Sequence, residues 1–281
     1  MTTRDISVAS SSSALPENAA GFSVLLRRWR DAPGVLPIGT FLGLVVLWEL
    51  STDVFAIPQY ILPAPSRIIG SGFSEIEPMR WAQHVWATLR VALMGYFLSI
   101  AISLPLAILL TKSKTLSRAV YPILVVIQST PVVAVAPIII VVLGSGDAPR
   151  IVITCLITFF PLVVSTATGL MATPPELIEL SRSLRAPVWR EITQIRLPYA
   201  VPYIFSALKI SITLAVIGAV VAEFVAAEKG IGYFIQFSTA FFKLPQAWAG
   251  LGILVLMSLL LFQAVALVQR VFFPWSIPKA E

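Results

Sequence analysis

Residues 174–202, PPELIELSRSLRAPVWREITQIRLPYAVP, form a polar segment between two long apolar stretches of this 281-residue chain. The segment holds three glutamates and four arginines, whereas residues 151–171 and 204–225 on either side are almost uncharged. Each flanking stretch is long enough to cross a bilayer, which takes about 20 mostly apolar residues. We call residues 174–200 the polar island, and we expect it to lie at a membrane surface, where a soluble protein can contact it.

The composition of the whole chain is that of a membrane protein. It is 57% hydrophobic and 12% charged, with a mean hydropathy of +0.89, whereas soluble domains are about half apolar and about a quarter charged. The net charge of +6 fits cytoplasmic loops rich in Lys and Arg better than nucleic-acid binding. One cysteine, Cys155, and one histidine, His84, make a metal site improbable. The first apolar run is too late and too long for a cleaved signal peptide.

Six stretches are long and apolar enough to span the membrane. They are Val35–Leu50, Leu89–Leu110, Ala119–Leu143, Ile151–Met171, Ile204–Val225 and Trp248–Val271. Arginines 27, 28 and 30 precede the first, which argues for a cytoplasmic N-terminus, and an even number of spans returns the C-terminus to the same side. The sequence therefore predicts an all-α polytopic membrane protein with six transmembrane helices.

The spans divide the chain into three parts. Residues 1–32 are expected to form a cytoplasmic tail that is partly disordered, because residues 1–20 are rich in Ser and Ala without a helical period. Residues 33–275 form the transmembrane domain, which contains the polar island, and residues 276–281 form a short cytoplasmic tail. In the outer loop after the first span, Ser66 is expected to cap a helix that follows Pro65.

The third span has an unusual sequence, with three prolines and a polar cluster at mid-depth. Pro122, Pro131 and Pro137 each remove a backbone hydrogen bond, and breaks at this depth are tolerated where they line a cavity or are buried in protein. We interpret the cluster as pore lining; the alternative is a kinked helix packed against its neighbours. The predicted pathway residues are Gln128, Ser129, Thr130 and Pro131, with Ser211 and Thr213 from the fifth span. Ser211 and Thr213 need not share a helical face, so we expect at most one of them to line the pore.

Two charged residues of the fifth span are expected to have structural roles. Lys209, placed near the inner end, and Glu223, placed near the outer end, are each expected to extend to the nearer interface. With Lys209 at the inner end, no basic side chain is expected at mid-depth of the pore, which argues mildly against a dedicated anion site.

Within the polar island, the sequence predicts two short helices joined by a turn. Thr173 is expected to cap the first, which begins at the prolines that follow it. Arg185-Ala186-Pro187 interrupts the helix, because the residue before proline disfavours the helical conformation. A second helix is expected to end before Pro198. A plain amphipathic connector would show the same composition.

The island also resembles a cytoplasmic signature of permeases in binding-protein-dependent ATP-binding-cassette (ABC) importers. That signature reads Glu-Ala-Ala, three residues, Gly, nine residues, Ile, one residue, Leu-Pro. Here Glu179-Leu180-Ser181, Arg185, Ile195 and Leu197-Pro198 have the same spacing, between the fourth and fifth spans as in the family. Arg185 replaces the glycine, which would cost on the order of 1 kcal/mol if the turn keeps a positive φ. ILPAPSRI and FVAAEKGIGYFI are similar to the nitrate, sulfonate and taurine branch.

The resemblance implies a type I ABC importer permease fold, in a dimer whose copies are each docked on a cytoplasmic ATPase in the bacterial inner membrane. A periplasmic or lipid-anchored binding protein would deliver a small solute. The family also serves pyrimidine precursors, riboflavin and aromatic acids, so the cargo stays open between these and oxyanions or sulfonates. ATP and Mg would be bound by the ATPase, with no cofactor in this chain. The residues expected to couple the two proteins are Glu179, Arg182, Arg185, Ala186, Trp189 and Arg190.

Other function classes have little support in the residues. No phosphate-binding loop of the form G-x-x-x-x-G-K-[ST] occurs, and no grouping of nucleophile and base suggests an enzyme. The alternative is a secondary transporter driven by an ion gradient, which would favour buried acidic pairs and repeated halves with matching broken helices. Neither is evident in the sequence.

Overall fold

The computed structural model describes residues 35–277, in which every regular element is a helix. The chain divides into two units, residues 1–58 and 59–281. In the first, helix α2 (Val35–Val54) is apolar and its side chains are largely exposed, as expected for a helix surrounded by lipid. Thr52 donates its hydroxyl to the Glu49 carbonyl at 2.8 Å. The predicted tail, residues 1–32, and its arginines lie outside the described residues.

The second unit is built around α4 (Pro78–Lys112), α7 (Asp147–Met171) and α10 (Leu197–Ala226). Helix α7 packs along both of the others. The approach is close because glycines face Thr154 of α7 from both sides: a Cβ on Gly95 would meet its side chain at 2.5 Å and one on Gly218 its backbone at 2.9 Å. Small residues at such positions let membrane helices pack tightly. Helix α12 (Leu244–Phe272) packs on α10.

Hydroxyl groups connect these helices at mid-length. Tyr96 of α4 donates to the Leu208 carbonyl of α10 at 3.2 Å, and Ser211 of α10 donates to the Thr158 carbonyl of α7 at 3.3 Å. These bonds satisfy polar groups where no water is at hand. They also fix the heights of the three helices relative to one another.

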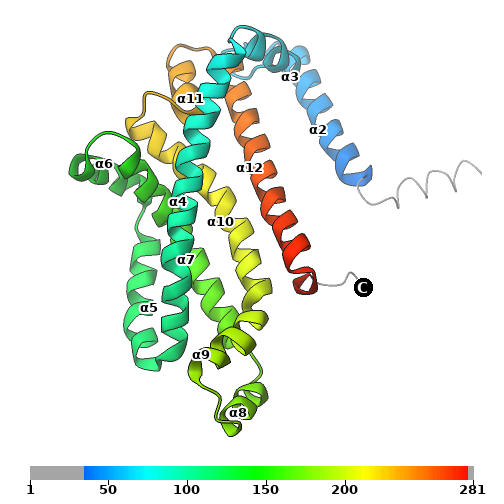
Figure 1. Ribbon diagram of the computed structural model, residues 1–281. Helices are drawn as coiled ribbons and strands as arrows, with labels where there is room; N and C mark the ends of the chain where they lie inside the picture. The colour runs from blue at the N-terminus through cyan, green and yellow to red at the C-terminus, as the bar shows by residue number, and fades with distance from the viewer. Residues whose placement is uncertain (1–34, 278–281) are drawn as a thin grey trace, which may run out of the picture. The chain divides into compact units, whose positions relative to one another are not determined.

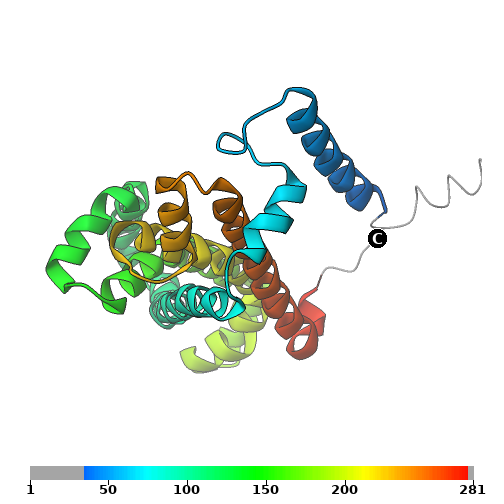
Figure 2. The same cartoon turned by 90° about the horizontal axis from the view of Figure 1, so that it is seen from above.

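The predicted third span is broken in two. Helix α5 (Lys114–Ser129) and helix α6 (Val132–Leu143) meet at Thr130 and Pro131 with a bend of 94°. Thr130 is extended (φ −76°, ψ 123°), as a residue before proline prefers. Pro122 and Pro137 lie inside α5 and α6, so of the three prolines expected to bend this span only Pro131 stands where the helix is interrupted. In both views α5 and α6 lie across the α4–α7–α10 group from α12 (Figures 1 and 2).

Five described helices are long and apolar enough to cross a membrane, and the bent α5–α6 pair makes six if it is counted as one span. The predicted all-α architecture is therefore confirmed, and its six spans hold with that pair counted once. Before α4, α3 (Pro65–Arg67) and the π-helical η1 (Ile68–Gly72) form a short helical segment. Its N-cap is Ala64, because Pro65 takes the first helical position, where no amide is needed; the predicted Ser66 cap is wrong.

At one end of the second unit, Glu223 is buried rather than extended to an interface, contrary to expectation. Its side chain is 1% exposed and accepts a hydrogen bond at 2.7 Å from the amide of Gly232 in α11 (Ile231–Ala240). The preceding amides donate to Thr88 and His84 of α4, at 2.8 and 3.1 Å. Side chains of α4 and α10 thus cap α11, whose free amides need such partners. We call residues 227–232 the Glu223 loop.

Candidate functional site

The polar island folds at the end of the α7–α10 pair, away from α11 (Figure 1). Helix α8 (Pro175–Ser183) begins at the predicted prolines, with Pro174 as N-cap. Thr173 does not cap it. The Thr173 hydroxyl donates back to the Leu170 carbonyl of α7 at 3.3 Å, which corrects that part of the prediction and ties the start of the island to α7.

After the turn, helix resumes at α9 (Val188–Arg190), continues through the π-helical η2 (Glu191–Arg196) and runs into α10. Pro198 does not end this run, contrary to expectation. The π segment closes with the Leu197 amide bonding to the Ile192 carbonyl five residues back, and Pro198 then occupies an initial position of α10. A missing amide is tolerated there. The island is therefore continuous with a membrane-spanning helix.

The turn between the two helices is built on Arg185, which has φ +51°. The Arg185 amide donates to the Arg182 carbonyl at 2.9 Å, and the Ala186 amide donates to the Ser181 carbonyl at 3.0 Å. These two bonds are the Schellman motif that commonly ends a helix, with the left-handed residue usually glycine. The turn thus keeps the geometry expected of the signature's glycine, although arginine occupies the position.

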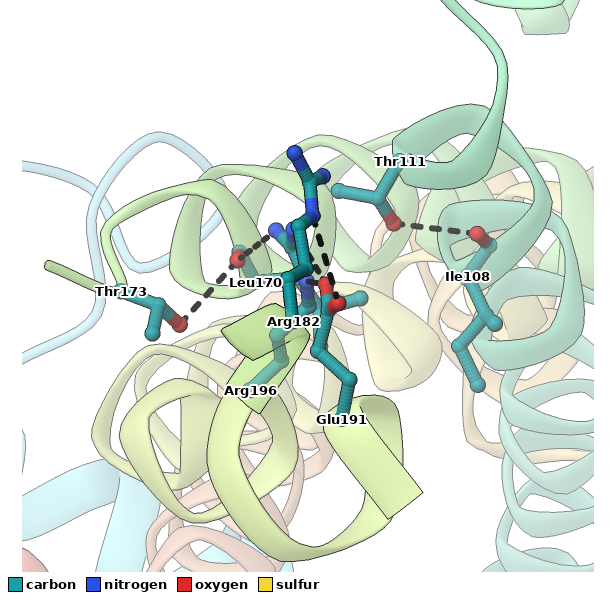
Figure 3. A network of polar contacts seen from close by, with 7 residues as sticks. All are labelled: Ile108, Thr111, Leu170, Thr173, Arg182, Glu191 and Arg196. Atoms are coloured by element: carbon teal, nitrogen blue, oxygen red, sulfur yellow. Dashed lines mark hydrogen bonds and ion pairs between the residues drawn. The ribbon is translucent and has the colours of Figure 1, made fainter. Parts of the chain in front are cut away.

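A buried ion pair fixes the second half of the island (Figure 3). Arg196 donates through Nε and Nη2 to Oε1 of Glu191, at 2.8 and 2.7 Å, and through Nη1 to the Leu170 carbonyl at 3.3 Å. The side chains of Glu191 and Arg196 are only 11% and 18% exposed. Arg182 of α8 lies 4.0 Å from the same carboxylate but is 72% exposed. The Arg196 guanidinium therefore joins η2 to the end of α7, and the Glu191 carboxylate that holds it lies close to Arg182 of α8.

Sequence reasoning missed this pair as a unit. Glu191 and Arg196 are five residues apart, and residues five apart do not face each other in an α-helix. The wider π turn brings them together. The available signal in the sequence was a pair of opposite charges five residues apart, closely followed by Pro198.

Most of the predicted coupling residues lie on the solvent-exposed surface of the island. Glu179, Arg182, Arg185, Trp189 and Arg190 are exposed and Ala186 is half-buried. Four large apolar side chains are exposed as well: Leu180 (56%), Leu184 (73%), Val188 (59%) and Trp189 (59%). The Arg190 guanidinium lies 5.5 Å from the centre of the Trp189 ring.

An open groove of about 360 Å³ lies between α8 and the π segment. Leu180 and Leu184 line one side of it, Ile195 lines the other, and Arg185 and Arg190 also border it. The exposed leucines and the groove were not among the sequence predictions. The available signal was that Leu180 and Leu184, four residues apart, fall on a different side of the helix from the buried Ile178 and Ser181. Apolar residues on that second side predict an exposed apolar surface.

The predicted pathway residues are divided between two places. Gln128, Ser129, Thr130 and Pro131 form the exposed break between α5 and α6. There, the hydroxyls of Ser129 and Thr130 donate to carbonyls of their own helix, at 2.8 and 2.9 Å.

The other two predicted residues lie on α10, where Ser211 is fully buried against α7 and Thr213 is half-buried. Within residues 35–277, no hydrogen bond joins Ser211 or Thr213 to the α5–α6 break.

Several helices long and apolar enough to cross a membrane, with a small polar helical segment at the end of α7 and α10 (Figure 1), define a polytopic membrane protein. The chain belongs to the family of binding-protein-dependent transport system inner membrane components, whose profile matches residues 83–276. It is thus a permease subunit of an ABC importer, a transporter subunit that is not itself catalytic. The family implies an ATPase and a substrate-binding protein as partners.

Among curated relatives, the formylaminopyrimidine transport permease protein ThiX of Halalkalibacterium halodurans is 34% identical over 88% of this chain and 98% of its own. The riboflavin transport system permease protein RibX of Chloroflexus aurantiacus is also 34% identical, over 86% and 90%. The taurine transport system permease protein TauC of Escherichia coli is 25% identical, over 85% and 89%. The predicted likeness to the taurine branch is therefore confirmed.

Among solved structures, the MetNI methionine ABC transporter in an inward-facing conformation matches with a TM-score of 0.61. The match is 25% identical and covers 69% of this chain and 98% of that chain. The expected fold of an ABC importer permease is thereby confirmed.

Proposed function

We propose that the polar island docks on a cytoplasmic ATPase subunit and transmits the movement of that subunit to the membrane helices. The observation that carries this proposal is a rigidly held segment with an exposed apolar face. Leucine, valine and tryptophan at 56–73% exposure outside the lipid are unfavourable in an isolated protein. A partner that covered them would bury apolar area at about 25 cal/mol per Å².

The charges on the same face suit recognition of that partner. Arg185 and Arg190 border the groove, and Arg182 and Glu179 are exposed on the same short helix as Leu180. Charged groups at the rim of an interface set orientation and association rate more than affinity. We assign the apolar residues to binding strength and the predicted coupling residues to orientation.

In the proposed cycle, the ATPase binds ATP and Mg and hydrolyses the ATP, and this chain contributes no catalytic group. Two permease copies, most simply two copies of this chain, form the pathway between them. Both termini face the cytoplasm, in agreement with the lysines and arginines of the loops on that side. Nucleotide on one side and a loaded binding protein on the other bias the same two-state gate.

The solute is proposed to be small, in the range that the relatives' names indicate, from taurine and formylaminopyrimidine to riboflavin. The exposed polar break of residues 128–131 and Thr213 remain the proposed lining. Ser211 is less suited, since it is fully buried and already bonded to Thr158.

The docking proposal is tested by the change Trp189→Ala, with Thr193→Ser as a matched control on the same helical run. Trp189 is exposed, and tryptophan is enriched among residues that dominate interface energies, so its loss should weaken ATPase binding by about 2 kcal/mol, or roughly 30-fold. Thr193 is exposed, and the serine can keep the hydroxyl bond to the Trp189 carbonyl. The control should bind as the original does.

Binding is measured by titrating the purified ATPase onto the permease in nanodiscs, with ATP turnover followed in parallel. Equal affinity for both variants and the original would refute docking through this face. An ATPase that binds none of the three would refute the wider proposal.

A further inference from the structure

Lys209 lies at the middle of the membrane-spanning helices, not near the inner end of the fifth span as its sequence position suggested. It is 12 residues after the start of α10 and 17 before its end. The neighbouring Leu208 bonds to Tyr96, which is 18 residues from one end of α4 and 16 from the other. Ser211, two residues on, bonds to Thr158, which is 11 and 13 residues from the ends of α7. Three helices therefore agree on the depth of Lys209.

A lysine at this depth needs an anionic or aqueous environment. The hydrocarbon core is about 30 Å thick, and a four-carbon stem is much shorter than half of that distance. An ammonium facing lipid at the centre costs at least about 2.5–3.5 kcal/mol. Ionisable residues in such positions normally face the interior of a bundle or a water-filled path.

No carboxylate of the second unit is placed to neutralise this charge. Among its described helices α4 to α7 and α10 to α12, the acids outside the polar island are Asp147 and Glu223. Asp147 is the first residue of α7, and Glu223 lies 14 residues, or about 21 Å, further along α10. No described ion pair includes Lys209. A second copy of this chain in a symmetric dimer would bring the same acid-free helices to this depth.

The neighbours of Lys209 on its helical face are polar. Ser206 and Thr213 lie three residues before it and four after it, so the three side chains share one side of α10. Ser206 is exposed, while Lys209 and Thr213 are half-buried. Lys209 also borders an exposed stripe of α10 that includes Tyr203, Ile210 and Ile217. The result is an ammonium flanked by two hydroxyls on a side of α10 that is open in the single chain.

We propose that Lys209 lines the translocation pathway and binds the anionic group of the transported solute, a sulfonate or a carboxylate, at mid-membrane. This inference rests on the proposed permease pathway and adds to it the charge of the cargo. The ammonium supplies the opposite charge that a small anion needs when it leaves water, and Ser206 and Thr213 supply hydroxyls beside it. The mild sequence argument against an anion site is thereby reversed.

The test measures aqueous access and local potential with charged thiol reagents on the permease–ATPase complex in nanodiscs. The background carries Cys155→Ser, since Cys155 is the only cysteine of the chain and is buried. In one variant Lys209→Cys reports access directly. In another, Ser206→Cys is a reporter beside the intact lysine. The anionic sulfonatoethyl and cationic trimethylammonioethyl methanethiosulfonates each form a mixed disulfide with the thiolate and release methanesulfinate.

The expected result is a modified thiol at position 209 and a reporter at position 206 that favours the anionic reagent. One unit charge about 6 Å away changes the ratio of anionic to cationic rates by about tenfold, even at the dielectric constant of water. Adding Lys209→Gln should remove that preference. The matched control Lys112→Gln, the same change at the exposed end of α4, should leave it unchanged.

Each other outcome is decisive. A thiol at position 209 that neither reagent modifies overturns the assignment to an aqueous pathway. A modified thiol with no change of ratio on Lys209→Gln overturns the anion site, because the lysine would then be neutral or already paired. Both readings require only that the ATPase remains bound to every variant, which co-purification checks. A permease that binds no ATPase counts against the proposed function instead.

Discussion

Replacing Arg185 with glycine is expected to stabilise the polar island, although the change removes a side chain and a charge. Arg185 has φ +51°, a left-handed conformation that costs a residue with a Cβ about 1–2 kcal/mol. Glycine avoids this cost but loses about 0.5–1 kcal/mol more backbone entropy on folding. The difference leaves about 0.5–1 kcal/mol in favour of Arg185→Gly. The exposed arginine has no described ion pair to set against that gain.

The assay is hydrogen exchange at the two amides that the turn protects, those of Arg185 and Ala186, whose acceptors are the Arg182 and Ser181 carbonyls. A gain of 0.5–1 kcal/mol slows exchange through local opening by about two- to fivefold. Arg185→Ala removes the same charge but keeps the strained φ, so its exchange should resemble that of the original. Faster exchange in the glycine variant than in the alanine variant would show that the left-handed turn is not strained and would refute the reasoning.

Two further changes test the contacts at the two ends of α10. Arg196→Ala leaves the Glu191 carboxylate largely buried without its main partner and should destabilise the island by about 3–5 kcal/mol. Arg182→Ala, which removes a mostly exposed group 4.0 Å from the same carboxylate, should cost less than about 1 kcal/mol; limited proteolysis of the island compares the two. Gly230→Ala should lower the melting temperature of the whole chain, because its φ is +131° and a Cβ would overlap the Glu223 carboxylate. We expect a cost of about 3 kcal/mol or more from strain and overlap together, whereas Gly144→Ala, with φ +80°, ψ 178° and open space around it, should cost only the backbone strain, about 1–3 kcal/mol. Equal effects within either pair would contradict the packing described.

Much of the fold follows from hydropathy and charge, and the errors have physical causes. The island was located correctly because seven charged residues between two apolar runs have no place in lipid. The spacing of the signature implied a turn at Arg185, with a positive φ if arginine kept the geometry of the glycine. The survival of that geometry with an arginine was not decided by sequence, because about 1 kcal/mol of strain is small beside the contacts that hold the two helices.

Three predictions about individual residues were wrong or incomplete, each for its own physical reason. Lys209 was placed near an end because the apolar run was taken to begin at Ile204, but the helix itself begins before that run. Glu223 was expected at an interface, yet it is buried, and the Gly232 amide donates a hydrogen bond to one of its carboxylate oxygens, which offsets part of the cost of burial. Of three prolines in the third span only Pro131 breaks it, since the outcome depends on whether neighbouring groups replace the lost bond.

The continuity of α9, η2 and α10 has a mechanical consequence. From Val188 to Ala226 the chain is 39 residues of uninterrupted helix, a rod about 58 Å long at 1.5 Å per residue. Turning such a rod by about 5° around one end displaces the other by about 5 Å, as in helix movements that repack interfaces. The π segment η2 departs from regular α-helical geometry within this lever, and the Glu191–Arg196 pair spans it from its first residue to its last. In the proposed docking on an ATPase, that ion pair would therefore govern how stiffly a push on the island reaches the Glu223 loop at the far end.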